Sequence, residues 1–123
     1  MYNIEDLFDE FLNYLKAEKN ASKSTITSYS TDFFVFLTFL KNNKITLDVE
    51  KIRTPDLRRY ITHLKIEKKY KVRTIRRKIH SLSSFFKYLL EMEYIMKNPM
   101  LPIHAPKEPD QVPIFIAEED LKN

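Results

Sequence analysis

The fold is decided by residues 73–91, RTIRRKIHSLSSFFKYLLE, in which apolar and basic side chains recur with the period of a helix. At about 100° per residue the apolar side chains gather on one side, which comprises Ile75, Ile79, Leu82, Phe86 and Leu89. The opposite side carries bases and hydroxyls, namely Arg73, Arg76, Arg77, His80, Ser84 and Lys87. One side can build a core and the other can meet phosphate groups. A solvated surface helix has a similar composition, since lysine and arginine are mostly exposed in proteins.

The charge of the chain is strongly polarised along its length. The 123 residues suffice for one domain with a sizeable core and a tail, and the net charge of +4 is modest. Residues 4–18 carry five acids against Lys16 alone, whereas residues 65–78 carry eight bases against Glu67 alone. A polyanion would therefore meet one end of the molecule and be repelled by another.

The composition excludes several kinds of site. Cysteine is absent, which rules out disulfides, thiolate zinc sites and a cysteine nucleophile. Glycine is absent, which rules out the glycine-rich loops that bind nucleotide phosphates, so no cofactor is predicted. The three histidines, His63, His80 and His104, lack the spacing of metal ligands, and no metal site is predicted.

The chain carries no signal for secretion or for a membrane. Met1 is followed by acids rather than by a basic segment and an apolar core. The longest apolar stretch, residues 33–40, is interrupted by Thr38 and falls short of the roughly 20 residues that span a bilayer. We expect a cytoplasmic chain with no membrane contact.

Four helical patterns follow one another with no strand pattern of any length between them. The first covers residues 4–18, with Asn3 as an expected N-cap. The second opens near Ser22 or Ser24 and extends to about Lys41. Its C-terminal half is apolar on most sides, so we expect that half to be buried nearly all round.

The third helix begins where three start signals agree. Thr54 is an expected N-cap, Pro55 suits the first helical position, and Asp56 suits the positive end of the helix dipole. This helix is expected to end near residue 68 or 69, and the basic segment forms the fourth helix, which must stop before Pro99. The sequence therefore predicts an all-α fold, a compact bundle of four main helices with a proline-rich C-terminal tail.

Helix ends in this chain must be closed without glycine. Asn20, Asn42 and Asn43 lie where the first two helices should stop. Asparagine is the next best residue for the left-handed conformation that commonly ends a helix, so these three are the expected C-terminal caps.

The composition changes at residue 98, from which five prolines recur up to position 113. We predict a helical domain at residues 1–97, a proline-rich interdomain linker at 98–113 and the truncated start of another domain at 114–123. The chain is thus expected to be a fragment of a longer protein, with a frayed C-terminal tail as the alternative.

Four stretches, taken in order, carry a resemblance to a known family. They are residues 24–37, STITSYSTDFFVFL; residues 54–61, TPDLRRYI; residues 73–89, RTIRRKIHSLSSFFKYL; and the succession Tyr94-Ile95, Asn98-Pro99, Pro106-Lys107 and Val112-Pro113. The chain resembles the N-terminal core-binding (SAM-like) domain of the tyrosine recombinases, or phage integrases, and most closely the Xer-type and simple integrase members. It departs from the family at Glu93, where many relatives have glycine, and at residues 114–120, which follow the usual entry to the catalytic domain only loosely.

The resemblance implies the function of the longer protein. Members of this family clamp duplex DNA between two domains, and the downstream domain holds the catalytic arginine, lysine, histidine and tyrosine. The fragment is therefore expected to have no catalytic residues and to cleave no DNA, while its parent would be a tyrosine recombinase that acts in DNA integration or recombination. The implied partners are double-stranded DNA and other recombinase subunits in a tetramer on DNA, with a monomeric fragment in isolation. The acidic first helix could then face a neighbouring subunit.

The resemblance also implies that the second and fourth helices lie against DNA. Their polar sides select the same two helices, because the fourth has the basic side described above and the second begins with a side lined by the hydroxyls of Ser24, Thr27, Ser28 and Thr31. The expected DNA-binding residues of the second helix are Lys23, Ser24, Thr25, Thr27 and Ser28. Those of the fourth are Arg73, Thr74, Arg76, Arg77, His80, Ser84 and Lys87.

Other interpretations of these residues remain open. Arg76 and Lys78 could extend along the edge of the core, and His80 could be a neutral surface residue. The chain could also be a free-standing helical DNA-binding regulator, or a protein-interaction bundle whose basic face meets an acidic partner.

Overall fold

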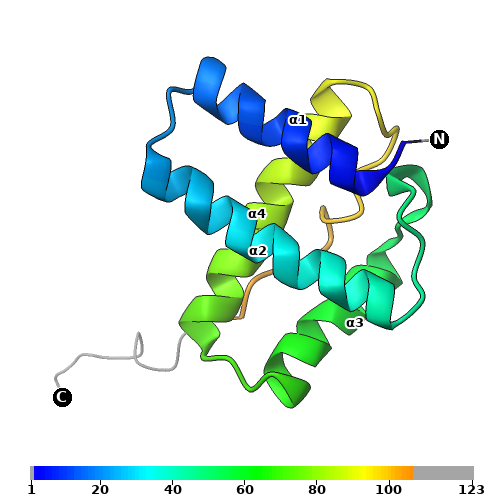
Figure 1. Ribbon diagram of the computed structural model, residues 1–123. Helices are drawn as coiled ribbons and strands as arrows, with labels where there is room; N and C mark the ends of the chain where they lie inside the picture. The colour runs from blue at the N-terminus through cyan, green and yellow to red at the C-terminus, as the bar shows by residue number, and fades with distance from the viewer. Residues whose placement is uncertain (1, 107–123) are drawn as a thin grey trace, which may run out of the picture.

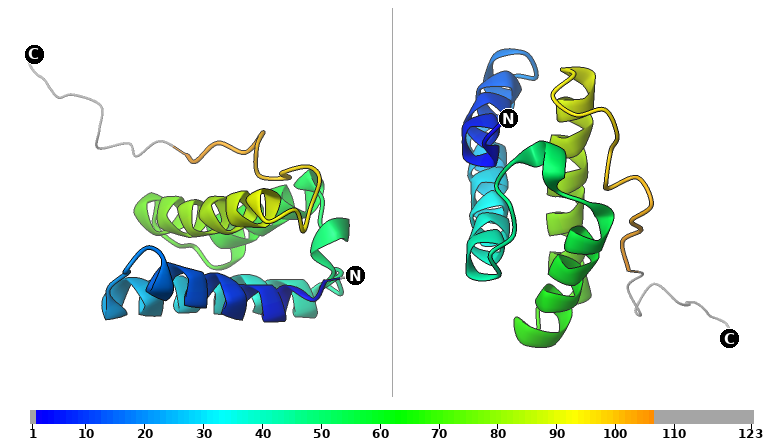
Figure 2. Two further views of the ribbon diagram at one scale, coloured as in Figure 1. Left: turned by 90° about the horizontal axis from the view of Figure 1, so that it is seen from above. Right: turned by 90° about the vertical axis from the view of Figure 1, so that its right-hand side faces the viewer.

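The computed structural model describes residues 2–106 as two layers of helices. The helices are α1 (Ile4–Ala17), α2 (Lys23–Asn42), α3 (Thr54–Thr62) and α4 (Val72–Glu91), with a 3-10 turn at Val49–Lys51 and a π-helical turn at His63–Glu67 that continues α3. Layers of α1 with α2 and of α3 with α4 pack face to face (Figures 1 and 2). The predicted all-α bundle of four helices is confirmed, and the described residues contain no β-strand.

Two α-helix starts are fixed by the side chain of the residue at the cap position. The Asn3 side-chain oxygen accepts a hydrogen bond from the Glu5 amide at 2.8 Å, as predicted. The Ser22 hydroxyl accepts one from the Thr25 amide at 3.2 Å. At α3 the cap position is residue 53 rather than the predicted Thr54, and the Thr54 hydroxyl instead donates to the Pro99 carbonyl at 2.8 Å.

The helix ends show how a chain without glycine makes left-handed turns. Within residues 2–106, four residues have a positive φ angle, and they are Asn20 (50°), Lys44 (54°), Lys69 (55°) and Glu93 (64°). Asn20 was predicted in this role. Asn43 is the C-cap of α2, as predicted, but its φ angle of −102° is not left-handed. The expectation for Asn42 was wrong, because α2 extends through it, and the left-handed residue is Lys44. Asn43 caps the helix differently, since its side-chain amide donates to the Phe39 carbonyl at 2.9 Å.

Stacked aromatic rings fill the core between the layers. The ring of Phe8 lies parallel to that of Phe33 with 3.9 Å between centroids, and Phe85 of α4 packs against both. The expectation that the C-terminal half of α2 is buried nearly all round was wrong in one place, because Phe34 is 68% exposed. None of the helices in the described part of the chain is long and apolar enough to cross a membrane.

The segment after α4 turns back and lies along the outer side of that helix (Figure 2). Its residues Ile95, Met100 and Ile103 are buried in the core. Within the predicted linker, residues 98–106 therefore pack against the bundle. Its remainder, residues 107–113, and the predicted start of another domain at 114–123 lie outside the described residues, so the predicted domain division remains a prediction.

Candidate nucleic-acid interface

The polar side of α4 lies opposite its buried side, as the sequence predicts. The five apolar residues of the predicted stripe are all buried. Steps of three and four residues place five of the predicted DNA-binding residues in one line along the helix. We call this line the basic stripe, and it consists of Arg73, Arg77, His80, Ser84 and Lys87. All but the half-buried Ser84 are exposed.

The predicted residues at the start of α2 are exposed, and several of their hydroxyls hold the helix end together. The Thr25 hydroxyl lies 2.9 Å from that of Ser22, and the Thr27 hydroxyl donates to the Lys23 carbonyl at 3.0 Å. Ser24 lies 3.2 Å from the same Ser22 hydroxyl. Ser22 is therefore the central residue of this helix end, although it is absent from the predicted site.

A buried carboxylate joins α2 to the basic stripe. Asp32 is only 2% exposed, yet it accepts three hydrogen bonds from α4. Arg77 and Lys78 donate to its Oδ1 at 3.0 and 2.9 Å, and Ser81 donates to its Oδ2 at 2.6 Å. Ser28 precedes Asp32 by one helical turn, so the hydroxyl-lined side of α2 adjoins the basic stripe.

The electrostatics of Asp32 are set by two opposing effects. Burial by itself would raise the pKa of this carboxyl group. The hydrogen bonds from Ser81, Arg77 and Lys78, together with the charge of Lys78, outweigh burial and hold the pKa below its ordinary value. Asp32 is therefore an anion with two cations around it, and the cluster carries a net charge of +1.

Lys78 and Arg76 have internal roles. The Lys78 side chain is buried, its amine bonds to Asp32, and the Tyr70 ring lies 5.5 Å away from that amine. Lys78 therefore belongs to the core and not to its edge. Arg76 is half-buried and donates from Nη1 to the Pro106 carbonyl at 2.7 Å, which ties the returning segment to α4. The half-buried Thr74 lies at the flank of the basic stripe.

The acidic helix α1 and the basic turn between α3 and α4 lie at opposite ends of the bundle (Figure 1). On α1, Glu10 accepts hydrogen bonds from the hydroxyls of Tyr88 and Tyr94, each at 2.8 Å. Burial and then the hydrogen bond to Glu10 raise the pKa of Tyr88. Since Glu10 holds α4 and the following turn, Asp9, which is exposed, is the better position at which to test contact with another subunit.

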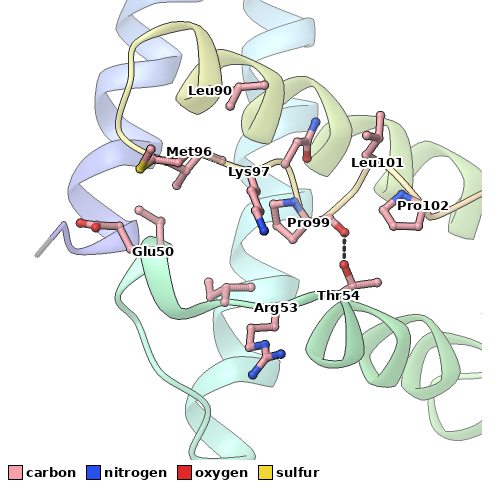
Figure 3. Close-up of a pocket in the computed structure, with 13 residues that line it drawn as sticks. Glu50, Arg53, Thr54, Leu90, Met96, Lys97, Pro99, Leu101 and Pro102 are labelled. Atoms are coloured by element: carbon pink, nitrogen blue, oxygen red, sulfur yellow. Dashed lines mark hydrogen bonds between the residues drawn. The ribbon is translucent and has the colours of Figure 1, made fainter.

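A groove of about 910 Å³ opens between the 3-10 turn, the start of α3 and the segment after α4 (Figure 3). Leu90, Met96 and Leu101 contribute much of its apolar lining, and the hydrogen bond from Thr54 to Pro99 crosses one side of it. None of the predicted DNA-binding residues lines this groove. Within residues 2–106 no three side chains of the kinds that bind metals come together to form a site.

Comparisons with known proteins identify the family. Residues 8–93 match the model for the phage integrase N-terminal SAM-like domain. Tyrosine recombinase XerC of Oceanobacillus iheyensis is 34% identical over 98% of this chain and 39% of its own length. The XerC of Bacillus licheniformis is 36% identical over 99% of this chain and 40% of its own length. The chain thus spans about two fifths of the length of these curated relatives.

A solved structure has the same fold. It is the N-terminal domain of a phage integrase/site-specific recombinase from Haloarcula marismortui, with a TM-score of 0.74 and 16% identity over 85% of this chain and 96% of that one. The family match covers α2, α3 and α4 completely and α1 from Phe8 onward, so it includes both helices that carry the site described above. The chain belongs to the tyrosine recombinase, or phage integrase, family and is an N-terminal SAM-like domain of that family.

Proposed function

We propose that this domain binds duplex DNA at the core site of a tyrosine recombinase, through the basic stripe of α4 and the start of α2. The observation that carries the proposal is the contact of Asp32 with Arg77, which makes the polar sides of two helices adjoin on one surface. Further support comes from the relatives named tyrosine recombinase XerC. Recombination is an activity of those longer proteins.

The chemistry of both helices suits a polyanion. The N-terminus of α2 offers backbone N–H groups and the positive end of a helix dipole, and short hydroxyl side chains let a phosphate approach closely. The bases of the stripe neutralise phosphates and release counterions. An arginine that reaches a guanine edge adds about 1–3 kcal/mol of discrimination between bases.

The remaining steps of recombination belong to the longer protein in this proposal. Strand cleavage and rejoining are assigned to a catalytic domain, so the domain described here binds DNA and does not cut it. Other recombinase subunits, as a tetramer on DNA, are the further partners. An isolated domain loses the avidity of the linked clamp and is expected to bind DNA weakly, as a monomer.

The test is a fluorescence-anisotropy titration of a labelled DNA duplex at several salt concentrations. One variant changes Arg73, Arg77 and Lys87 to alanine. A control variant removes the same charge elsewhere by changing the exposed lysines Lys16, Lys51 and Lys97 to alanine. Thermal melting of all three proteins confirms that they are folded before the affinities are compared.

The expected affinity falls with salt, with a log–log slope of about −0.9 for each phosphate contacted. The stripe variant should flatten this slope, and the control variant should leave it close to that of the native chain. Equal slopes for the two variants would show that only total charge matters, and would refute the basic stripe as the DNA-binding surface. Absence of binding at low salt by a folded native chain would favour the protein-interaction bundle instead.

A further inference from the structure

The buried cluster around Asp32 contains one more cation than its charge requires. Lys78 is buried beside Asp32 and neutralises it, since its amine lies 2.9 Å from Oδ1. Arg77 donates to the same Oδ1 at 3.0 Å, but its side chain is 52% exposed. A buried carboxylate needs partners, and Lys78 with Ser81 already supplies a charge and a second hydrogen bond. The bond to Arg77 is therefore available for a role other than charge balance.

The bond from Arg77 restricts where its guanidinium can go. A long side chain on a helix surface samples many rotamers, and the contact with a fixed carboxylate selects among them. Asp32 is itself fixed, because Ser81 and Lys78 of α4 donate hydrogen bonds to its two oxygens. The guanidinium of Arg77 is thus held at the edge of the basic stripe that adjoins α2.

We propose that Asp32 is a positioning residue for DNA binding, which holds the guanidinium of Arg77 in place on the basic stripe before DNA arrives. This inference rests on the proposed function. In this proposal Asp32, a buried residue of α2, contributes to the affinity of the basic stripe on α4 for DNA.

The chemistry of the guanidinium allows both contacts at once. Its group carries five N–H donors in a planar fork, and the bond to Asp32 uses Nη2. A phosphate or a guanine edge can be bound by the donors that remain. Because Lys78 balances the charge of Asp32, Arg77 still presents a full positive charge to DNA.

A guanidinium that is already ordered should raise DNA affinity, because binding then loses less side-chain entropy. Immobilising one side chain of this kind at an interface typically weakens association by about two- to twelve-fold. Loss of the anchor should therefore reduce affinity by a factor in that range, without any change in the charge of the stripe.

The test is a double-mutant cycle on DNA affinity. The double substitution Asp32→Leu with Lys78→Met removes the acceptor of the Arg77 bond together with one negative and one positive charge, so the net charge stays at +4 and no buried charge is left without a partner. Arg77→Ala is made in the native chain and in this double variant. All four proteins are titrated against one fluorescein-labelled duplex of random sequence at fixed salt, after thermal melting has shown that they fold.

The outcomes separate the two proposals. If Asp32 positions Arg77, the double variant loses about two- to twelve-fold in affinity, and Arg77→Ala costs clearly less in it than in the native chain. If the effects of the double substitution and of Arg77→Ala on affinity were fully additive, or if the double variant bound DNA as tightly as the native chain, the positioning role would be overturned. A loss of affinity in Arg77→Ala would still support the basic stripe as the DNA-binding surface. If Arg77→Ala left the DNA affinity of the native chain unchanged, and the stripe and control variants had equal salt slopes, the proposed function itself would be refuted.

A second measurement needs no substitution. Nitrogen-15 relaxation of arginine side chains reports how far each guanidinium is ordered on the fast timescale. Without DNA, the Nε of Arg77 should be markedly more ordered than that of Arg58, an exposed arginine on α3. Equal mobility at the two positions would overturn the proposal even if the double variant failed to fold.

Discussion

Replacing the left-handed residues with glycine should stabilise this domain. Lys44, Lys69 and Glu93 have φ angles of 54°, 55° and 64°, and all three side chains are exposed. Such a conformation costs a residue with a Cβ atom about 1–2 kcal/mol, which glycine avoids. Glycine also lowers the free energy of unfolding by about 0.5–1 kcal/mol, because it makes the unfolded chain more flexible. We therefore expect each substitution to raise the free energy of unfolding by about 0.5–1 kcal/mol.

The three sites lie at the ends of different helices, so their effects should add to about 1.5–3 kcal/mol in a triple variant. The backbone bonds at two of these turns, from the Lys44 amide to the Lys41 carbonyl and from the Glu93 amide to the Leu90 carbonyl, are retained by glycine. Urea unfolding followed by circular dichroism measures the gain.

The matched control is Lys16→Gly, which places glycine inside α1 at an exposed position with helical geometry. There the change should lower the free energy of unfolding by about 1 kcal/mol. If the triple variant were destabilised as well, or left unchanged, the left-handed turns would carry no strain and the reasoning would be refuted.

Two further predictions concern buried polar groups. Tyr60 is 1% exposed, and its hydroxyl has no hydrogen-bond partner within the described chain. Tyr60→Phe should therefore raise the free energy of unfolding in urea by about 1 kcal/mol. A decrease of that size would mean that the hydroxyl is hydrogen-bonded. Because the pKa of Asp32 is lowered in the folded state, its contribution to stability is present above the unfolded pKa of about 3.9 and is lost as the pH falls through the folded value. The urea midpoint of the native chain should thus drop more steeply below about pH 4 than that of the variant with Asp32→Leu and Lys78→Met, and parallel curves would contradict this.

The helices and their buried faces could be predicted because they depend on local periodicity. The pattern of residues 73–91 repeats every 3.6 residues, and burial of Ile75, Ile79 and Leu82 follows from that period alone. Helix starts were predictable where a cap bonds within its own first turn, as at Asn3. The cap at Thr54 was not, because its hydroxyl is drawn to a carbonyl 45 residues away.

The polar contacts of the site were less predictable, because they join residues that are far apart in the sequence. In the sequence Asp32 directly precedes the aromatic residues Phe33 and Phe34, but nothing in that pattern identifies its partner. The sequence placed Lys78 at most along the edge of the core, and only the packing of α2 on α4 brings it to Asp32. Arg76 was grouped with the stripe, although the returning segment at Pro106 engages it from the other flank of the helix.

The continuation of α3 was predicted in extent but not in kind. The sequence indicated one helix to about residue 68, and the chain does stay helical to Glu67. Its last part, His63–Glu67, is a π-helical turn. Here the His63 ring packs 5.0 Å from that of Phe39 on α2, so this turn also meets a neighbouring helix. Contacts of that kind do not follow from local propensity.

The pairing of Glu10 with Tyr88 and Tyr94 also sets an order of events during synthesis. Glu10 leaves the ribosome 78 residues before Tyr88, which at roughly 5–20 residues per second is about 4–16 s. In that interval α1 can stack Phe8 on Phe33 of α2, but the α1 surface that meets α4 stays uncovered. The nascent chain therefore presents an amphipathic hairpin to chaperones and to other chains until its last helix is made.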